Sequence, residues 1–78
     1  MSTPNISEEY IHQQRVALGA KLKAIRLERG LTLEQVGELI GTGKSTVSKI
    51  EAGTWNASIS WFILFAHALE FDISFILK

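Results

Sequence analysis

Residues 31–53 have the hydrophobic and polar pattern of two short helices joined by a tight turn. Thr32 is a favourable N-cap residue, and Gln35 follows it at the spacing of a capping box. Gly41 can end the first helix and Gly53 the second, because glycine tolerates the left-handed conformation found at helix ends. The apolar residues of the first helix recur at helical spacing: Leu33, Val36, Leu39 and Ile40.

The second helix of this pair has only a narrow apolar stripe, formed by Val47 and Ile50. Thr42 or Ser45 is the expected N-cap. Short or cationic side chains occupy the other side, and such a surface suits the major groove of DNA, where they can bond base edges. A helical hairpin with an ordinary solvated face would show the same pattern, so the pattern alone leaves both interpretations open.

A longer helix is predicted before this pair. Ser7 is a suitable N-cap, followed by two acids in the first turn, and the helix should run for about 20 residues to Gly30. Gly19 lies inside it and indicates either a break or a close approach to another helix. Residues 1–6 are expected to form a flexible arm, and residues 7–78 a single domain. One face of the helix is apolar, with Ile11, Leu18, Leu22 and Ile25.

The segment after residue 58 is apolar on nearly all sides. Ser58 is the expected cap of a helix whose core stripe would comprise Ile59, Phe62, Phe65, Ala66 and Leu69. Three further apolar residues have no place in the core of so small a monomer, and exposed apolar clusters usually mark an interface. We therefore expect a homodimer surface that includes Trp61, Ile63 and Leu64.

Residues 71–77 alternate between apolar and mostly polar positions, and this period of two predicts a strand. A lone strand leaves its backbone groups unpaired, so its simplest partner is the same strand of a second copy. Ile73, Phe75 and Leu77 are accordingly expected at the dimer interface. The alternative is a short fifth helix.

Composition narrows the classes of function. The chain has 78 residues and no cysteine, which allows one small domain without disulfides or thiolate metal sites. It lacks a long apolar run and a signal-peptide pattern, so we expect a cytoplasmic protein that is not in a membrane. The net charge is zero, yet residues 15–50 hold seven basic and three acidic residues, a net of +4. This distribution predicts DNA binding through few phosphate contacts and a shallow salt dependence.

No catalytic centre, metal site or cofactor is expected. The run GTGKST resembles part of a phosphate-binding loop, but the required first glycine is replaced by Glu38, and Gly37 lies one place too early. His12 and His67 are far apart in sequence and have no acid partner at a useful spacing. His67 is expected to be a surface or interface residue.

Several of these residues together resemble the lambda-repressor-like helix-turn-helix family, also called the XRE family. The resemblance covers about residues 21–69 and rests on Leu31-Thr32, Glu34, the run GTGKSTVSKIEAG at 41–53, and Ala66 with Leu69. It implies an all-α fold, a compact bundle of four helices with the helix-turn-helix motif at about 32–52. The second helix of the motif would then read DNA.

The resemblance also implies roles for individual residues. Arg26 would pair with Glu51 and brace the first helix against the third. One position departs from the family: Leu33 stands where many relatives carry a glutamine that binds a DNA phosphate. The loop at 54–57 would run beside the DNA backbone, with Trp55 either packed over the recognition helix or exposed. The expected DNA-binding residues are Thr32, Gln35, Lys44, Ser45, Thr46, Ser48, Lys49 and Asn56.

These observations predict a homodimeric, sequence-specific regulator of transcription, most simply a repressor, whose two recognition helices enter major grooves about 34 Å apart at a near-palindromic operator. One alternative is an antitoxin that also covers a toxin protein, since some antitoxins of this family are similar in ending with a strand that pairs between subunits. Another is a protein-interaction module that no longer binds DNA, which the zero net charge and Leu33 favour.

Overall fold

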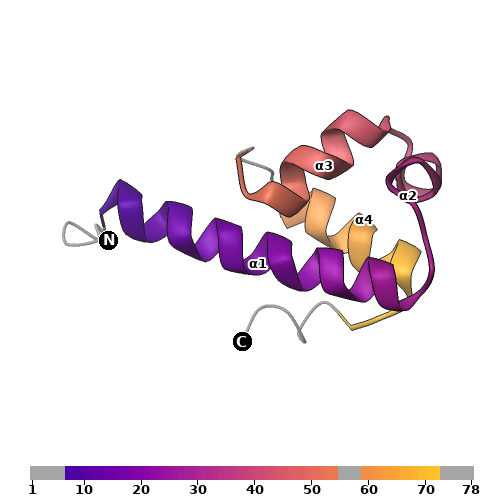
Figure 1. The fold of residues 1–78 in the computed structure, drawn as a ribbon, viewed down its shortest axis with the longest axis horizontal. Coiled ribbons are helices and arrows are strands. Elements are labelled where there is room, and N and C mark those ends of the chain that lie inside the picture. Colours follow the sequence, from indigo (N-terminus) through magenta and orange to yellow (C-terminus); the bar gives the residue numbers. More distant parts are fainter. Residues whose placement is uncertain (1–6, 55–58, 73–78) are drawn as a thin grey trace.

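The computed structural model describes residues 7–54 and 59–72, and this part of the chain forms four helices without a strand. The all-α, four-helix prediction is confirmed. Figure 1 shows the longest helix, α1, running along the length of the molecule, with the three shorter helices grouped over one side of it. None of the helices in the described ranges is long and apolar enough to cross a bilayer. The helices are α1 (Glu8–Glu28), α2 (Leu33–Ile40), α3 (Lys44–Ala52) and α4 (Ile59–Leu69).

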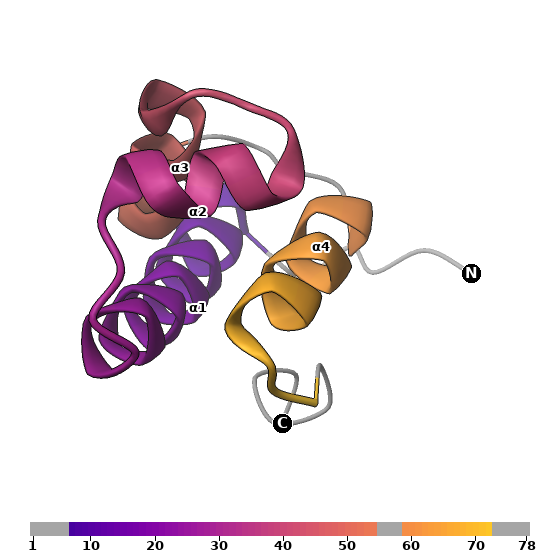
Figure 2. The same cartoon turned by 90° about the vertical axis from the view of Figure 1, so that its right-hand side faces the viewer.

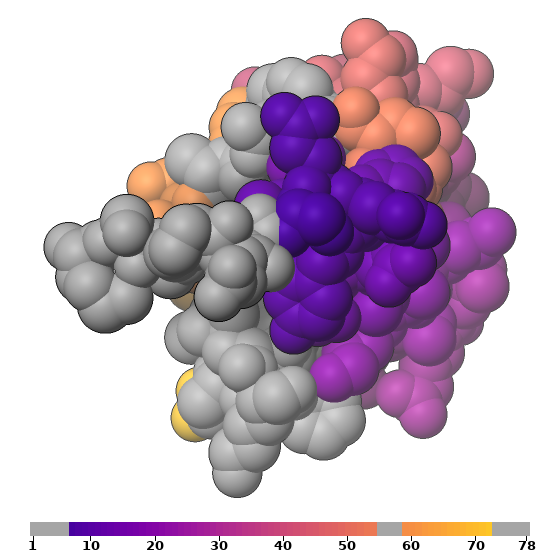
Figure 3. Space-filling view, turned by 90° about the vertical axis from the view of Figure 1, so that its left-hand side faces the viewer, coloured from indigo at the N-terminus to yellow at the C-terminus, as the bar shows by residue number. Residues whose placement is uncertain are grey.

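Helix α1 begins as the sequence predicts, with the Ser7 hydroxyl accepting a hydrogen bond from the Tyr10 N–H at 3.0 Å. Residues 7–14 are all exposed, and in Figure 3 the first turns of α1 stand at the front of the molecule. This projection explains why Ile11, expected on the core face, is 43% exposed. The chain leaves the helix through Gly30, which has a φ of 73°.

Gly19 does not break α1, which is continuous for 21 residues. The close-approach interpretation is the correct one. A Cβ atom at this position would lie 2.6 Å from the Ile50 carbonyl oxygen and 2.7 Å from the Glu51 carbonyl carbon. Only a glycine allows the end of α3 to pack so near the backbone of α1.

Helix α2 has both bonds of the predicted capping box: the Gln35 N–H donates to the Thr32 hydroxyl at 3.1 Å, and the Thr32 N–H donates to the Gln35 side-chain oxygen at 2.8 Å. The cap predicted for α3 is wrong, because its N-cap is Gly43, without a side-chain bond. The turn folds back onto α2, where the Thr42 N–H donates to the Gly37 carbonyl at 2.8 Å. This bond closes the C-terminal end of α2, and α3 begins two residues later at Lys44.

All four helices contribute to one core. Figure 2, which looks along α1, shows α4 lying beside α1 and α2. Ile59, predicted in the core, is 53% exposed because it begins α4 at the edge of the packed region. Trp61 is half-buried against the core and so differs from the exposed Ile63 and Leu64. The buried core residues are Leu22, Ile25, Val36, Ile40, Val47, Ile50, Phe62, Phe65 and Leu69.

Helix α4 ends in a Schellman motif, in which the Phe71 N–H donates to the Ala66 carbonyl at 3.0 Å. Glu70 occupies the left-handed position of the motif, with a φ of 60°. The Arg29 Nε atom donates to the Leu69 carbonyl at 2.9 Å and ties this end to α1. Residues 73–77 of the strand predicted at 71–77 lie outside the described residues, as does the predicted arm at 1–6.

Candidate nucleic-acid interface

Helix α3 has one buried side and one exposed side. Val47, Ile50 and Glu51 are buried. At 100° per residue, the opposite side carries Ser45, Ser48, Lys49 and Ala52, all of them exposed, and we call these four residues the outer face of α3. Of the other predicted contact residues, Lys44 is exposed and Thr46 is half-buried beside this face. Ala52 was absent from the predicted set, although its spacing from Ser48 and Lys49 was a signal for it.

A buried ion pair holds the end of α3 against α1. The Arg26 Nε atom donates to one Glu51 carboxylate oxygen at 2.6 Å, and its terminal nitrogen donates to the other at 3.1 Å. The two side chains are only 7% and 5% exposed. Such two-point contacts are geometrically specific, so the pair fixes how α3 sits on α1. The sequence predicts this pair, and the structure brings the two side chains together.

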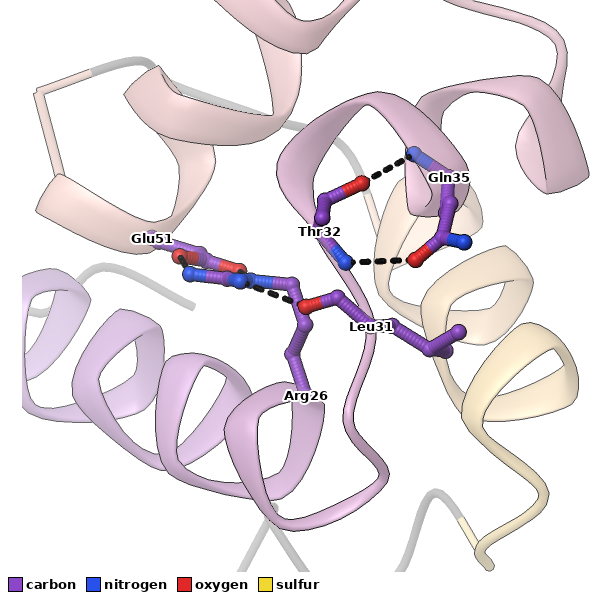
Figure 4. A network of polar contacts seen from close by, with 5 residues as sticks. All are labelled: Arg26, Leu31, Thr32, Gln35 and Glu51. Atoms are coloured by element: carbon purple, nitrogen blue, oxygen red, sulfur yellow. Dashed lines mark hydrogen bonds and ion pairs between the residues drawn. The ribbon is translucent and has the colours of Figure 1, made fainter.

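The same arginine extends the network to α2. Its remaining guanidinium nitrogen donates to the Leu31 carbonyl at 2.8 Å, immediately before Thr32 and the capping box (Figure 4). Arg26 therefore links α1, the start of α2 and the end of α3. The start of α2 and the outer face of α3 are consequently held in a fixed relation to each other.

Thr32 and Gln35 are exposed at the start of α2, but the capping box already uses the threonine hydroxyl and the glutamine oxygen. The Gln35 side-chain amide nitrogen is the group left to donate to a ligand. Leu33 is half-buried and packs against the core, which accounts for an apolar side chain at this position.

The other predicted site residues lie on α4 or outside the described ranges. Trp61, Ile63 and Leu64, predicted for the dimer interface, belong to α4. Asn56 and Trp55 lie outside the described residues, as do Ile73, Phe75 and Leu77.

Comparison with known families identifies the motif. Residues 17–74 match the family described as a helix-turn-helix domain. The chain belongs to this helix-turn-helix family. Its fold is that of the lambda-repressor-like DNA-binding regulators, as the resemblance in the sequence predicts.

Solved structures of bacterial regulators are similar to this helix-turn-helix domain over most of their length. The clp gene regulator ClgR from C. glutamicum is 30% identical, with a TM-score of 0.78 over 82% of this chain and 83% of that chain. The restriction-modification controller protein C.AhdI from Aeromonas hydrophila is 28% identical, with a TM-score of 0.79 over 83% of this chain and 94% of that chain.

The hypothetical transcription factor NHTF from Neisseria is 25% identical, with a TM-score of 0.77 over 86% of this chain and 78% of that chain. No match was found among curated proteins. The family match and these similar structures place the domain among DNA-binding regulators of transcription.

Proposed function

We propose that this helix-turn-helix protein is a sequence-specific repressor that acts as a homodimer on a near-palindromic operator. The observation that carries the proposal is the outer face of α3. The side chains of Ser45, Ser48 and Lys49 make no hydrogen bond or ion pair within residues 7–54 and 59–72. They are free to bond base edges, while the buried side of the helix is fixed by the core and by the Arg26–Glu51 pair.

The chemistry of this face suits the major groove. A lysine donates to the guanine acceptors, and serine hydroxyls donate or accept at several bases. Ala52 adds a methyl group that can contact a thymine methyl. Lys44 at the start of α3 and the Gln35 amide nitrogen at the start of α2 are exposed and supply donors for phosphates, which would set the register of the helix on the duplex. Thr46, half-buried at the edge of the face, and Asn56 complete the proposed contacts.

The names of the similar structures support a role in transcription, since ClgR is called a gene regulator and C.AhdI a controller protein. The exposed Ile63 and Leu64 of α4 support the dimer, because exposed apolar neighbours usually mark an interface. Together with Trp61 and the terminal segment at 71–77, they form the proposed contact between subunits. A two-fold dimer would place two copies of α3 one helical turn of DNA apart, about 34 Å.

The test is to incubate the purified protein with random genomic DNA fragments and to sequence those bound at two salt concentrations. We expect an enriched motif with two-fold symmetry, retained at the higher salt. Binding without enrichment would contradict sequence-specific reading, since backbone contacts alone carry no sequence information. Absence of binding at low salt would exclude DNA binding and favour a protein-interaction module.

A further inference from the structure

The side of α1 that faces away from the core carries a line of uncharged residues about five turns long. Figures 1 and 2 show the other three helices grouped over one side of α1. On the opposite side, six residues recur at alternating spacings of three and four, as do the contact positions of a coiled coil. All six are exposed, and we call them the α1 seam: Tyr10, Gln13, Ala17, Ala20, Ala24 and Leu27.

The first turns of α1 lack a packing partner among the residues that the structure describes. Residues 7–14 are all exposed, and Tyr10 is 50% exposed although its ring is largely apolar. Helices in proteins gain most of their stability from packing, so exposed turns of this kind are stabilised by a partner. Tyr10 and Gln13 also precede residue 17, where the match to the helix-turn-helix family begins. The seam is therefore not part of the DNA-binding motif.

A second copy of the chain fits the seam, because the seam matches itself in the antiparallel direction. A contact between identical copies about a two-fold axis must be self-complementary. With the axis midway between Ala17 and Ala20, every seam residue faces another seam residue, and no like charges meet within it. The small side chains at the centre allow the two backbones to approach closely. The facing pairs are Tyr10 with Leu27, Gln13 with Ala24, and Ala17 with Ala20.

The large residue at the start of the seam has a place to pack. An open and mostly apolar groove lies beside Leu27. The antiparallel register brings Tyr10 of the second copy to this groove, where its ring covers apolar surface. Its hydroxyl can donate to the exposed carboxylate of Glu28, and tyrosine suits such a groove because its apolar ring carries a polar tip. The residues that line the groove are Lys21, Ala24, Ile25, Leu27 and Glu28.

We propose that the α1 seam is an interface with a second copy of this chain, antiparallel about a two-fold axis between Ala17 and Ala20. The contact is about 25 Å long and one helix wide, smaller than the roughly 1,200 Å² of a stable interface, so it joins copies only at high protein concentration. It is distinct from the contact proposed at α4, and the two together give an assembly larger than a dimer. The inference goes beyond the proposed function and does not depend on DNA binding.

Cysteine cross-linking tests the antiparallel register, since the natural chain contains no cysteine. Gln13→Cys and Ala24→Cys are made separately in the Ile63→Asp protein, which lacks the proposed α4 contact. The two variants, distinguished by mass, are mixed at high concentration under mild oxidation. The register places the two different thiols opposite each other. Two copies of one variant hold their thiols about 16 Å apart along the helix, which is too far for a disulfide.

We expect disulfides between the two different variants and almost none within either variant alone. Disulfides that form equally within and between variants would indicate random collision and overturn the inference. Disulfides only within each variant would indicate parallel helices and would overturn the antiparallel contact.

Sedimentation at rising concentration gives an independent measurement. The Ile63→Asp protein, monomeric when dilute, should associate as its concentration rises. Ala20→Glu should weaken this association by more than about tenfold, because it places like charges near the axis of the contact. His12→Glu is the matched control: it adds the same charge to the exposed start of α1, about 100° from the seam, and should leave the association unchanged. Circular dichroism establishes that both variants remain folded.

Equal association of the Ala20→Glu and Ile63→Asp proteins would overturn the inference, as would an Ile63→Asp protein that stays monomeric at every concentration. These outcomes leave the proposed DNA-binding function intact, because the experiment with genomic fragments tests that function separately.

Discussion

Arg26 and Glu51 are 25 residues apart in sequence and joined by two hydrogen bonds in the interior of the domain. The arginine also donates to the carbonyl of Leu31, so that one side chain bonds both the residue before the cap of α2 and the last turn of α3. Two charges have been taken out of water to form this contact, and the attraction between them offsets the desolvation penalty of each. The arrangement is therefore far more sensitive to loss of one partner than an ion pair on the surface.

Replacing Glu51 with Ala should destabilise the domain by about 3–5 kcal/mol, because the Arg26 charge would remain buried without its partner. Urea unfolding followed by circular dichroism measures this change. The double variant Arg26→Met/Glu51→Leu should recover most of the loss, since it removes both charges and fills the space. A single-variant cost below about 1 kcal/mol would indicate that the pair behaves like a solvent-exposed one.

Replacing Gly19 with Ala should destabilise the domain by about 1–3 kcal/mol, since the new methyl group would overlap the last carbonyl groups of α3. In an unobstructed helix interior the same change would stabilise by up to about 1 kcal/mol. The exposed neighbour provides the control: Ala20→Gly should cost about 1 kcal/mol through helix propensity alone. Thermal unfolding measures the change in stability of both variants, and a Gly19→Ala protein more stable than the wild type would contradict the close approach of α3 to α1.

The helix ends could be predicted from the sequence because their causes are local. Ser7 and Thr32 cap with their own hydroxyl groups, and Gly41 and Gly53 adopt the left-handed conformation that ends a helix. The cap of α3 could not be predicted in the same way. Its N-cap is Gly43, which has no side chain to form a capping bond, so the polar side chains of Thr42 and Ser45 were misleading signals.

Tertiary contacts also explain three points that the sequence alone left open or assigned wrongly. Gly19 allowed two interpretations until the carbonyl groups of α3 were placed against it. Lys23 carried no signal, because it lines a small hollow with Leu33 and Ser48 only through the way α1, α2 and α3 pack together. Trp61 was assigned to the surface from the apparent size of the core, yet it packs against that core. For Gly19 and Lys23 the deciding neighbours are distant in sequence.

Replacing Glu70 with Gly should stabilise the domain by about 1 kcal/mol. Glu70 has a φ of 60°, a conformation that is costly for residues with a Cβ atom and free of strain for glycine. Glu70→Ala is the control, because alanine keeps the Cβ atom and should leave stability nearly unchanged. Urea midpoints that rise equally for both variants would assign the effect to the removed charge instead.

Lys49 and Lys44 should differ in how their loss affects DNA binding. Lys49 belongs to the outer face of α3 and aligns with Ser45 one turn earlier, whereas Lys44 begins the helix to one side of that line. Lys49→Ala should weaken operator binding by about 1–3 kcal/mol and relax the preference at one base pair. Lys44→Ala should weaken binding to all sequences alike. Competition between operator and random duplexes separates these outcomes, and identical behaviour of the variants would contradict the assignment.

Replacing Ile63 with Asp should convert the protein to a monomer. Ile63 is 50% exposed on α4, so a carboxylate there would still be solvated in the monomer but would be buried in the proposed dimer contact. Leu39→Asp is the matched control, because Leu39 is 60% exposed on α2 and is not assigned to the interface.

Sedimentation measures the oligomeric state of both Asp variants. The Ile63→Asp protein should also lose affinity for a complete operator while binding a single half-site as the wild type does, since its α3 is unchanged. A dimer of unaltered strength would show that this side of α4 does not join the subunits.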